Sequence, residues 1–328
     1  MPTKDARTGA AAVLAAAALL LTAACSGGGA GGATPAAGTA APAAAAGPSP
    51  RPPAGPYAAL GDSYTSGPDI PRQHGTPVGC RRSSRDYPAL VAAGLGLAAA
   101  DFRDVSCTGA TIADLGKAQS TTQGVNPAQL SALTARTRLV TLGIGGNDVG
   151  FTSVLTRCVQ DGVLLSLGLG DQQGAAAGDA PCQAYWTSGG RDVLQERVAA
   201  TGRRLAAALT EVRRRAPRAR VFVVGYPALV PAGGPSCTAA LGLAAGDVAF
   251  LHRAEQRLNA ELRRRAEAAG AHYVDTWSPS LSHDACAAAT VRWIEPLMPT
   301  AAAAPLHPNE RGERGMADAV LRAVRAPA

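Results

Sequence analysis

From residue 57 onward, short apolar runs alternate with longer segments in which apolar residues recur at helical spacing. Short apolar runs bounded by Gly, Pro, Asp or Asn are typical of buried β-strands. The pattern predicts strands at residues 57–60, 102–106, 138–144, 221–225 and 272–274.

Two segments with a regular apolar stripe separate the last three of these strands. One stripe comprises Leu194, Val198, Leu205, Leu209 and Val212, and the other comprises Leu251, Leu258 and Leu262. We expect two long helices, ended by Pro217 and Gly270. Strands separated by helices indicate right-handed crossovers and a parallel sheet covered on both faces, so the predicted fold class is α/β. Ligands bind such sheets beyond the carboxyl ends of the strands.

The N-terminal segment has a different pattern. Lys4 and Arg7 precede an apolar run at residues 10–21, which is too short to span a bilayer comfortably. We therefore interpret residues 1–25 as a signal peptide. Residues 26–56 consist almost entirely of Gly, Ala, Pro, Ser and Thr, which predicts a disordered tether before a domain at 57–328.

The signal peptide ends in "LLTAACSGG", which resembles a bacterial lipobox. Acylation of Cys25 would hold the protein at the outer face of a membrane. Thr22 stands where an aliphatic residue is usual, so simple cleavage and free secretion is the alternative. Both interpretations predict an exported protein.

The cysteine count is consistent with export. Of seven cysteines, six remain once Cys25 is set aside, and an even set in an exported chain suggests three disulfides. Fifteen pairings are possible, and the wide sequential spacing favours neighbours in sequence. The five histidines are scattered and no Cys-x-x-Cys or His-Glu-x-x-His motif is present, so we expect no metal site.

Composition and charge narrow the functional classes. With 328 residues, 47% of them apolar, the chain can bury one substantial core. The net charge of +7 comes from 31 basic residues, all arginine except Lys4 and Lys117, most of them on polar faces of predicted helices. Such arginines are typical of solvated helix faces rather than of a groove that binds nucleic acid, so we expect no nucleic-acid partner. We expect a monomer.

Candidate chemistry begins at "GDSYTSG", where Ser63 follows the first predicted strand. A hydroxyl at the carboxyl end of a parallel strand lies where ligands bind. The motif is not the G-x-S-x-G elbow, because Thr65 replaces the second glycine. Taken alone, such a serine is more often a helix cap than a nucleophile.

Three further stretches change that interpretation. In "GGND", Asn147 follows a strand and could offer its amide to an oxyanion, and Gly109 in "CTGAT" could offer a backbone N–H. In "PLHPN", His307 precedes a terminal helix that Asn309 could cap. Together they supply a nucleophile, oxyanion donors and a base.

The four stretches resemble the SGNH hydrolases, also called GDSL lipases and esterases, and most closely their secreted actinobacterial branch. The resemblance covers residues 57–326 and implies a three-layer α/β/α sandwich with a mostly parallel, flavodoxin-like sheet. It implies Ser63 as nucleophile, His307 as general base, and Ser63, Gly109 and Asn147 as oxyanion-hole donors. The branch also implies disulfides Cys80–Cys107, Cys158–Cys182 and Cys237–Cys286.

One position departs from the family pattern. Many members carry an aspartate three residues before the histidine, where this chain has Ala304. A base needs a group that holds its tautomer, and we expect a backbone carbonyl in residues 301–305 to do so. Asp275, Asp284 and Glu295 are possible substitutes that nothing in their spacing distinguishes.

The resemblance implies a serine ester hydrolase that works through an acyl-enzyme without a cofactor. Lipid esters, acetyl esters of carbohydrates and phospholipids all remain open as substrates. A binding lipoprotein that keeps the fold without turnover is the alternative from another class. We predict an irregular segment, without regular secondary structure, at residues 161–180. Within it, residues 164–170 either line an acyl site or merely pack.

Overall fold

The structure is a computed structural model that describes residues 55–169, 179–233 and 235–327. The predicted signal peptide, Cys25 and nearly all of the predicted tether lie outside these residues, so the predictions made for them stay predictions. Among the described helices, none combines the length and apolar character needed to span a bilayer.

The centre of the described domain is a sheet of five parallel strands. In spatial order they are β4 (Phe102–Asp104), β1 (Tyr57–Gly61), β7 (Leu139–Gly143), β8 (Arg220–Val224) and β9 (His272–Val274). In chain order this is the 2-1-3-4-5 arrangement of flavodoxin-like sheets. All five predicted strands and the predicted parallel pairing are confirmed. β1 and β7 are buried along their whole length, because both lie inside the sheet.

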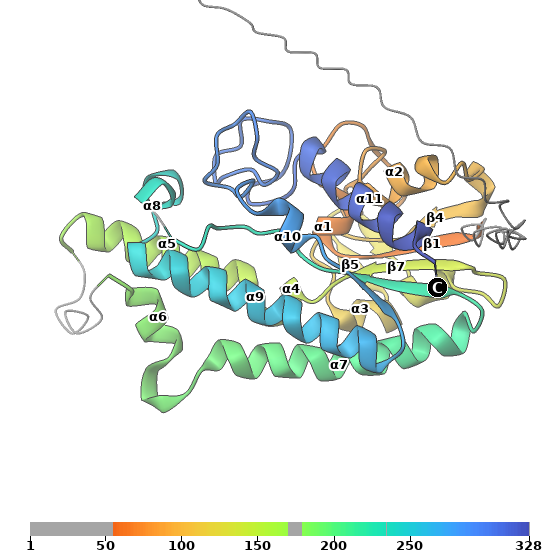
Figure 1. Ribbon diagram of the computed structural model, residues 1–328, viewed down its shortest axis with the longest axis horizontal. Coiled ribbons are helices and arrows are strands. Elements are labelled where there is room, and N and C mark those ends of the chain that lie inside the picture. Colours follow the sequence, from red (N-terminus) through yellow and green to blue (C-terminus); the bar gives the residue numbers. More distant parts are fainter. Residues whose placement is uncertain (1–54, 170–178, 234, 328) are drawn as a thin grey trace, which may run out of the picture. The chain divides into compact units, whose positions relative to one another are not determined.

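Helices cover both faces of this sheet (Figure 1). On one face α7 (Val193–Arg215) and α9 (Ala245–Ala268) share a core cluster with residues of β7 and β8. On the other face α2 (Tyr87–Gly94) and α11 (Glu310–Arg325) pack with alternate residues of the same strands. Each predicted stripe residue of α7 and α9 is buried, which confirms the two long helices and the three layers.

The remaining elements are short, apart from α5, and lie mainly around the sheet's carboxyl edge. The helices are α1 (Ser63–Ser66), α3 (Ile112–Gly116), α4 (Gly146–Val149), α5 (Phe151–Ser166), α6 (Pro181–Trp186), α8 (Pro235–Leu241) and α10 (Trp277–Ser280). Two small hairpins are formed by β2 (Gln73–His74) with β3 (Arg82–Ser83), and by β5 (Gln119–Thr121) with β6 (Gly124–Asn126).

The structure corrects the prediction of an irregular excursion at residues 161–180. Residues 161–166 continue α5 as a regular helix, whereas 170–178 lie outside the described residues. Gly162, within this stretch, is a packing residue. A Cβ on Gly162 would lie 2.2 Å from the Gly242 carbonyl oxygen, so only glycine lets α5 approach that backbone. α5, α6 and α8 thus build a second core cluster with α9.

The six cysteines are joined in the three sequential pairs that the resemblance implies: Cys80–Cys107, Cys158–Cys182 and Cys237–Cys286. The first pair brings the segment before β3 to the loop that carries Gly109. The second joins α5 to α6, and the third joins α8 to the segment that leads toward His307. Each bridge therefore anchors a segment beyond the sheet rather than the sheet itself.

Candidate active site

Ser63 lies at the tight turn between β1 and α1. Asp62 caps this short helix, because its Oδ1 accepts a hydrogen bond from the Tyr64 N–H at 2.9 Å. The turn also needs Gly61, where a Cβ would lie 2.2 Å from Thr65 Oγ1 and 2.5 Å from the Gly143 carbonyl oxygen. Ser63 thus becomes the first residue of a helix, at the carboxyl end of a central strand.

His307 reaches Ser63 from the loop before α11. Its Nε2 lies 2.7 Å from Ser63 Oγ, and its Nδ1 lies 2.7 Å from the Pro305 carbonyl oxygen. The carbonyl can only accept, so Nδ1 carries the proton and Nε2 is free to accept from the serine hydroxyl. Burial lowers the pKa of His307, the Pro305 contact partly offsets this, and the Arg81 charge lowers it further. A neutral imidazole is the form that a general base requires.

The carbonyl of Pro305 lies in the 301–305 segment where we expected a backbone acceptor. Among the described residues, no carboxylate hydrogen-bonds to His307, and the three possible substitutes are occupied elsewhere. Asp275 accepts from Ser278 and lies beside Arg263, and Asp284 accepts from the Cys286 N–H.

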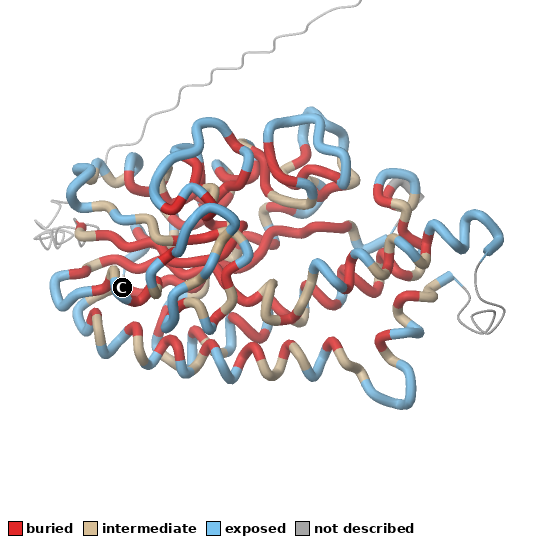
Figure 2. The backbone as a smooth tube through the Cα atoms, turned by 180° about the vertical axis from the view of Figure 1, so that it is seen from behind, coloured by how far each residue is buried: buried red, intermediate tan, exposed pale blue. Residues whose placement is uncertain are grey.

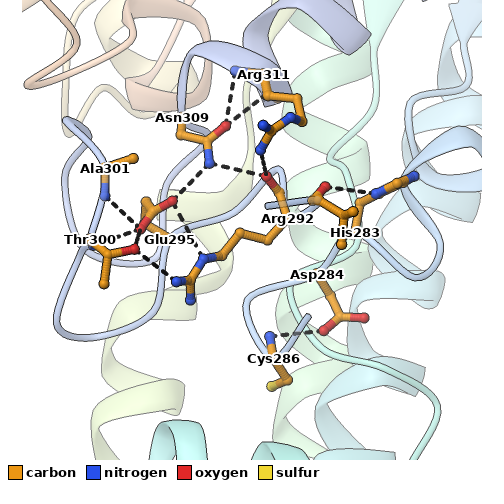
Figure 3. Close-up of polar contacts among 11 residues, drawn as sticks. His283, Asp284, Cys286, Arg292, Glu295, Thr300, Ala301, Asn309 and Arg311 are labelled. Atoms are coloured by element: carbon orange, nitrogen blue, oxygen red, sulfur yellow. Dashed lines mark hydrogen bonds and ion pairs between the residues drawn. The ribbon is translucent and has the colours of Figure 1, made fainter. Parts of the chain in front are cut away.

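Glu295, the third of them, is hydrogen-bonded to Thr300, Ala301 and Asn309, which lie on either side of His307 in sequence (Figure 3). Its fully buried carboxylate accepts hydrogen bonds from the Thr300 and Ala301 N–H groups and from Asn309 Nδ2. Burial alone would raise the pKa of Glu295, but these bonds and the Arg292 charge lower it below its usual value. Its own backbone pairs with His307 and Leu306. The carboxylate therefore holds the loop without touching the imidazole.

The candidate oxyanion donors come from three separate segments of the chain, at Ser63, Gly109 and Asn147. Asn147, on α4, donates one amide hydrogen to the Ala110 carbonyl oxygen at 2.9 Å, which leaves the second hydrogen free. Gly109 has a φ of 76°, a backbone conformation that other residues rarely adopt. Within the described residues, the N–H groups of Ser63 and Gly109 donate to no protein acceptor. All three residues line one cavity.

Tyr226, two residues after β8, joins the turn that carries Ser63 to α4, the helix that carries Asn147. Its hydroxyl donates to Asp62 Oδ2 and accepts from the Gly146 N–H at 2.8 Å. Burial raises the pKa of Asp62 to about 7, although the hydrogen bonds from Tyr226 and from the Tyr64 N–H partly offset the shift. Tyr226 was not among the residues that the sequence pointed to. The available signal was its place just after a predicted strand.

A cavity of about 400 Å³ opens beside Ser63 and His307. Phe151, Leu155 and Val159 of α5 form one wall at four-residue spacing. The other aliphatic lining residues are Leu229, Leu258, Leu297, Pro305 and Leu306. Glu255 also lines the cavity, and burial raises the pKa of its carboxyl well above the usual value, which favours the neutral acid. Thr152, Thr156 and Gln160 of α5 line the cavity as well, so it is polar at the serine and carries an apolar row beside a polar one along α5.

The expectation for residues 164–170 is wrong on both of its alternatives, as far as they are described. Residues 164–169 neither line the cavity nor pack in a core, since the exposed fractions of Leu164 and Leu167 are 43% and 64%. The residues that do line it lie earlier on the same helix, because α5 continues where a loop was expected.

A serine hydroxyl bonded to a correctly oriented imidazole, beyond the carboxyl edge of a 2-1-3-4-5 parallel sheet, places the protein among the serine hydrolases of the α/β class. Residues 59–314 match the GDSL-like lipase/acylhydrolase family, and the chain belongs to that family.

Relatives from Streptomyces agree with this assignment. "Lipase 2" of Streptomyces coelicolor is 42% identical over 275 residues, which are 83% of this chain and 87% of the relative. The crystal structure of phospholipase A1 from Streptomyces albidoflavus NA297 superposes with a TM-score of 0.65 at 30% identity, covering 84% of this chain and 100% of that one. For the extracellular lipase of Streptomyces rimosus the TM-score is 0.60 at 26% identity, covering 81% and 98%. The chain is thus a carboxylic ester hydrolase, as the sequence predicted.

Proposed function

We propose that Ser63 is the nucleophile and His307 the general base of a hydrolase acting on esters of medium-length acyl chains. The observation that carries the proposal is the relay from Ser63 Oγ to His307 Nε2 and from Nδ1 to the Pro305 carbonyl, at the mouth of an apolar cavity. The Pro305 contact supports a dyad with backbone assistance in place of a third, carboxylate member.

The reaction follows from these groups. His307 Nε2 takes the Ser63 proton as Oγ attacks the ester carbonyl, and the resulting oxyanion accepts from the Ser63 and Gly109 N–H groups and from Asn147 Nδ2. The imidazolium then protonates the departing alcohol, which leaves an acyl-serine. Water, deprotonated by the same imidazole, attacks the acyl-serine and releases the carboxylic acid.

The cavity favours an acyl chain over an acetyl group. From Phe151 to Val159 the α5 wall spans eight residue steps, roughly 12 Å along the helix axis. An extended chain rises about 1.2 Å per bond, so the wall accommodates an acyl group of about ten carbons. An acetyl ester would leave most of this apolar wall without contact.

A chain-length series of p-nitrophenyl esters, from acetyl to palmitoyl, tests the proposal. We expect kcat/KM to be highest near ten carbons, and Leu155→Trp, which fills the middle of the cavity, to move the optimum to shorter chains. Ser63→Ala should abolish turnover and labelling by a fluorophosphonate. Ser66→Ala, at a buried serine of the same helix, is the matched control and should keep both. An acetyl optimum would contradict the acyl-chain assignment, and labelling of Ser63→Ala would contradict the nucleophile.

We also propose that the protein is exported and lipid-anchored at Cys25. Support comes from the N-terminal sequence, from the three disulfides, and from the similarity to the extracellular lipase of Streptomyces rimosus. In a native host, the wild-type protein should fractionate with membranes, whereas Cys25→Ala should not. A freely secreted, unacylated wild type would show simple signal-peptide cleavage instead.

A further inference from the structure

The far end of α5 exposes a run of apolar side chains that the proposed reaction does not use. We call it the α5 tip, residues 163–169. Figure 2 shows this end of the helix largely in the exposed colour. Its exposed apolar residues are Val163, Leu164, Leu165, Leu167 and Leu169. Patches of this kind on a water-exposed surface usually mark an interaction site.

The exposure extends around the helix rather than along one stripe. Val163, Leu164 and Leu165 are consecutive, so they point in directions about 100° apart, and all three are more than two-fifths exposed. A groove or a flat protein surface covers one face of a helix, as α7 and α9 are covered here. A tip that is apolar in several directions is suited to a fluid apolar phase that can surround it.

Charge supports the same conclusion. Residues 162–169 include no ionisable side chain, and the charged residues of α5 are Arg157 and Asp161. These two form an ion pair at 2.7 Å, and the Arg157 guanidinium also lies 4.0 Å from the ring centre of Tyr185. Insertion of the tip into lipid therefore buries no unpaired charge.

The tip also follows the cavity wall along the same helix. Phe151, Leu155 and Val159 line the cavity, and Val163 is the next residue in the same four-residue row. An acyl chain that leaves a lipid layer at the tip would meet an apolar row leading along α5 toward Ser63. This gives one helix two functions, one at each end.

We propose that the α5 tip inserts into the acyl region of aggregated lipid and brings the cavity to the lipid surface. The proposal rests on the function proposed above, since it concerns how that site meets its substrate. It commits to a lipid layer as the partner rather than to a second copy of the chain or another protein.

Vesicle binding tests the proposal. The double variant Leu164→Asp/Leu167→Asp is compared with Val78→Asp/Val125→Asp, a matched control at two similarly exposed apolar residues away from α5. All proteins carry Cys25→Ala to remove any lipid anchor, and Ser63→Ala to leave the lipids intact. The probe is sedimentation with phosphatidylcholine vesicles. We expect the tip variant to bind at least tenfold more weakly than the parent, and the control to bind within twofold of it.

A second measurement separates this proposal from the function itself. With Ser63 intact, the tip variant should hydrolyse dissolved p-nitrophenyl butyrate within twofold of the parent but lose at least tenfold on emulsified ester. Equal vesicle binding by tip variant and parent would overturn the proposal. So would a dimeric parent that the tip substitutions make monomeric, because a second copy would then cover the tip. Failure of the parent to hydrolyse the dissolved ester would count against the proposed function alone.

Discussion

Ser63 and His307 meet in one hydrogen bond but are supported in different ways. The turn that carries Ser63, the proposed nucleophile, leaves β1, a strand bonded to β4 and β7 on its two sides, and continues at once into α1. His307, the proposed base, lies in a long loop between α10 and α11, where the isolated bridge between Ile294 and Pro308 is a short piece of strand pairing. Regular backbone bonding therefore positions the serine, whereas one buried carboxylate, Glu295, organises the loop that positions the histidine.

This comparison predicts that substitutions near Ser63 and near His307 have different effects, although loss of either proposed reacting group should abolish activity. A sheet is held by many backbone hydrogen bonds that no side-chain substitution removes. A loop held by one side chain depends on that side chain.

The largest effect is expected at the reacting groups. Ser63→Ala and His307→Ala should each lower kcat by about 10³-fold or more, and the double variant should be no worse than either, because the two residues act as a unit. Steady-state kinetics on a dissolved ester measures this, with circular dichroism to check folding. A double variant whose loss is the product of the two single losses would contradict the shared role.

Substitution of Tyr226 should weaken the positioning of the turn that carries Ser63. Tyr226→Phe removes the bonds to Asp62 and to the Gly146 N–H, so we expect kcat to fall roughly 10–100-fold with little change in KM, since positioning rather than binding is lost. Tyr57→Phe is the matched control, because it removes a buried hydroxyl whose partner is Thr141, within the sheet. If both variants lose activity equally, Tyr226 has no positioning role.

Substitution of Glu295, in the loop that carries His307, should lower the stability of the fold more than it lowers kcat. Glu295→Gln puts an amide opposite the Asn309 amide and weakens the buried network, so we expect a loss of about 1–3 kcal/mol in the free energy of unfolding. Denaturant unfolding measures it, and kcat at low temperature should stay within severalfold of wild type. Glu310→Gln, in exposed ion pairs with Arg85 and Arg314, should cost at most about 1 kcal/mol. Equal losses in the two variants would contradict the role of Glu295.

The most specific effect is a pair of opposite pH dependences of stability. The pKa of Asp62 is raised from 3.8 to about 7, so the folded state binds more protons between these values and its stability falls as pH rises through this window. The pKa of Glu295 is lowered from 4.5, so its contribution is complete above pH 4.5 and is lost as pH falls through the lower folded value.

Unfolding free energies across pH 3–8 should therefore separate the two supports. Asp62→Asn should flatten the decline above pH 4, and Glu295→Gln should flatten the fall in acid. If the unfolding free energy of a variant depends on pH as that of the wild type does, the carboxyl that was replaced does not titrate as described.

The sequence predicted the parts of the molecule that depend on local pattern. Apolar runs located all five strands of the central sheet, and helical stripes located α7 and α9, because burial imposes a period on each element. Ser63 and Asn147 were found for a related reason, since each follows a predicted strand at the edge where parallel sheets bind ligands.

The supports of the site were not predictable in the same way. Tyr226 and Glu295 act through contacts with residues distant in sequence or with loop backbone, and no periodicity reports such contacts. The prediction of an irregular segment at residues 161–180 failed for the same reason. A glycine that breaks a helix and one that packs against a distant carbonyl, as Gly162 does, look alike in sequence.

The distance along the chain between Ser63 and His307 affects when activity can first appear during synthesis. A polypeptide made only as far as residue 300 already contains Ser63 and every strand of the central sheet, yet it lacks His307 and α11. Asn309 caps α11 with its Oδ1 and binds Glu295 with its Nδ2, so folding of the final helix and closure of the base loop depend on the same side chain. An incomplete chain thus lacks the proposed Ser63–His307 pair, so under the proposed function ester hydrolysis begins only once the last helix is in place.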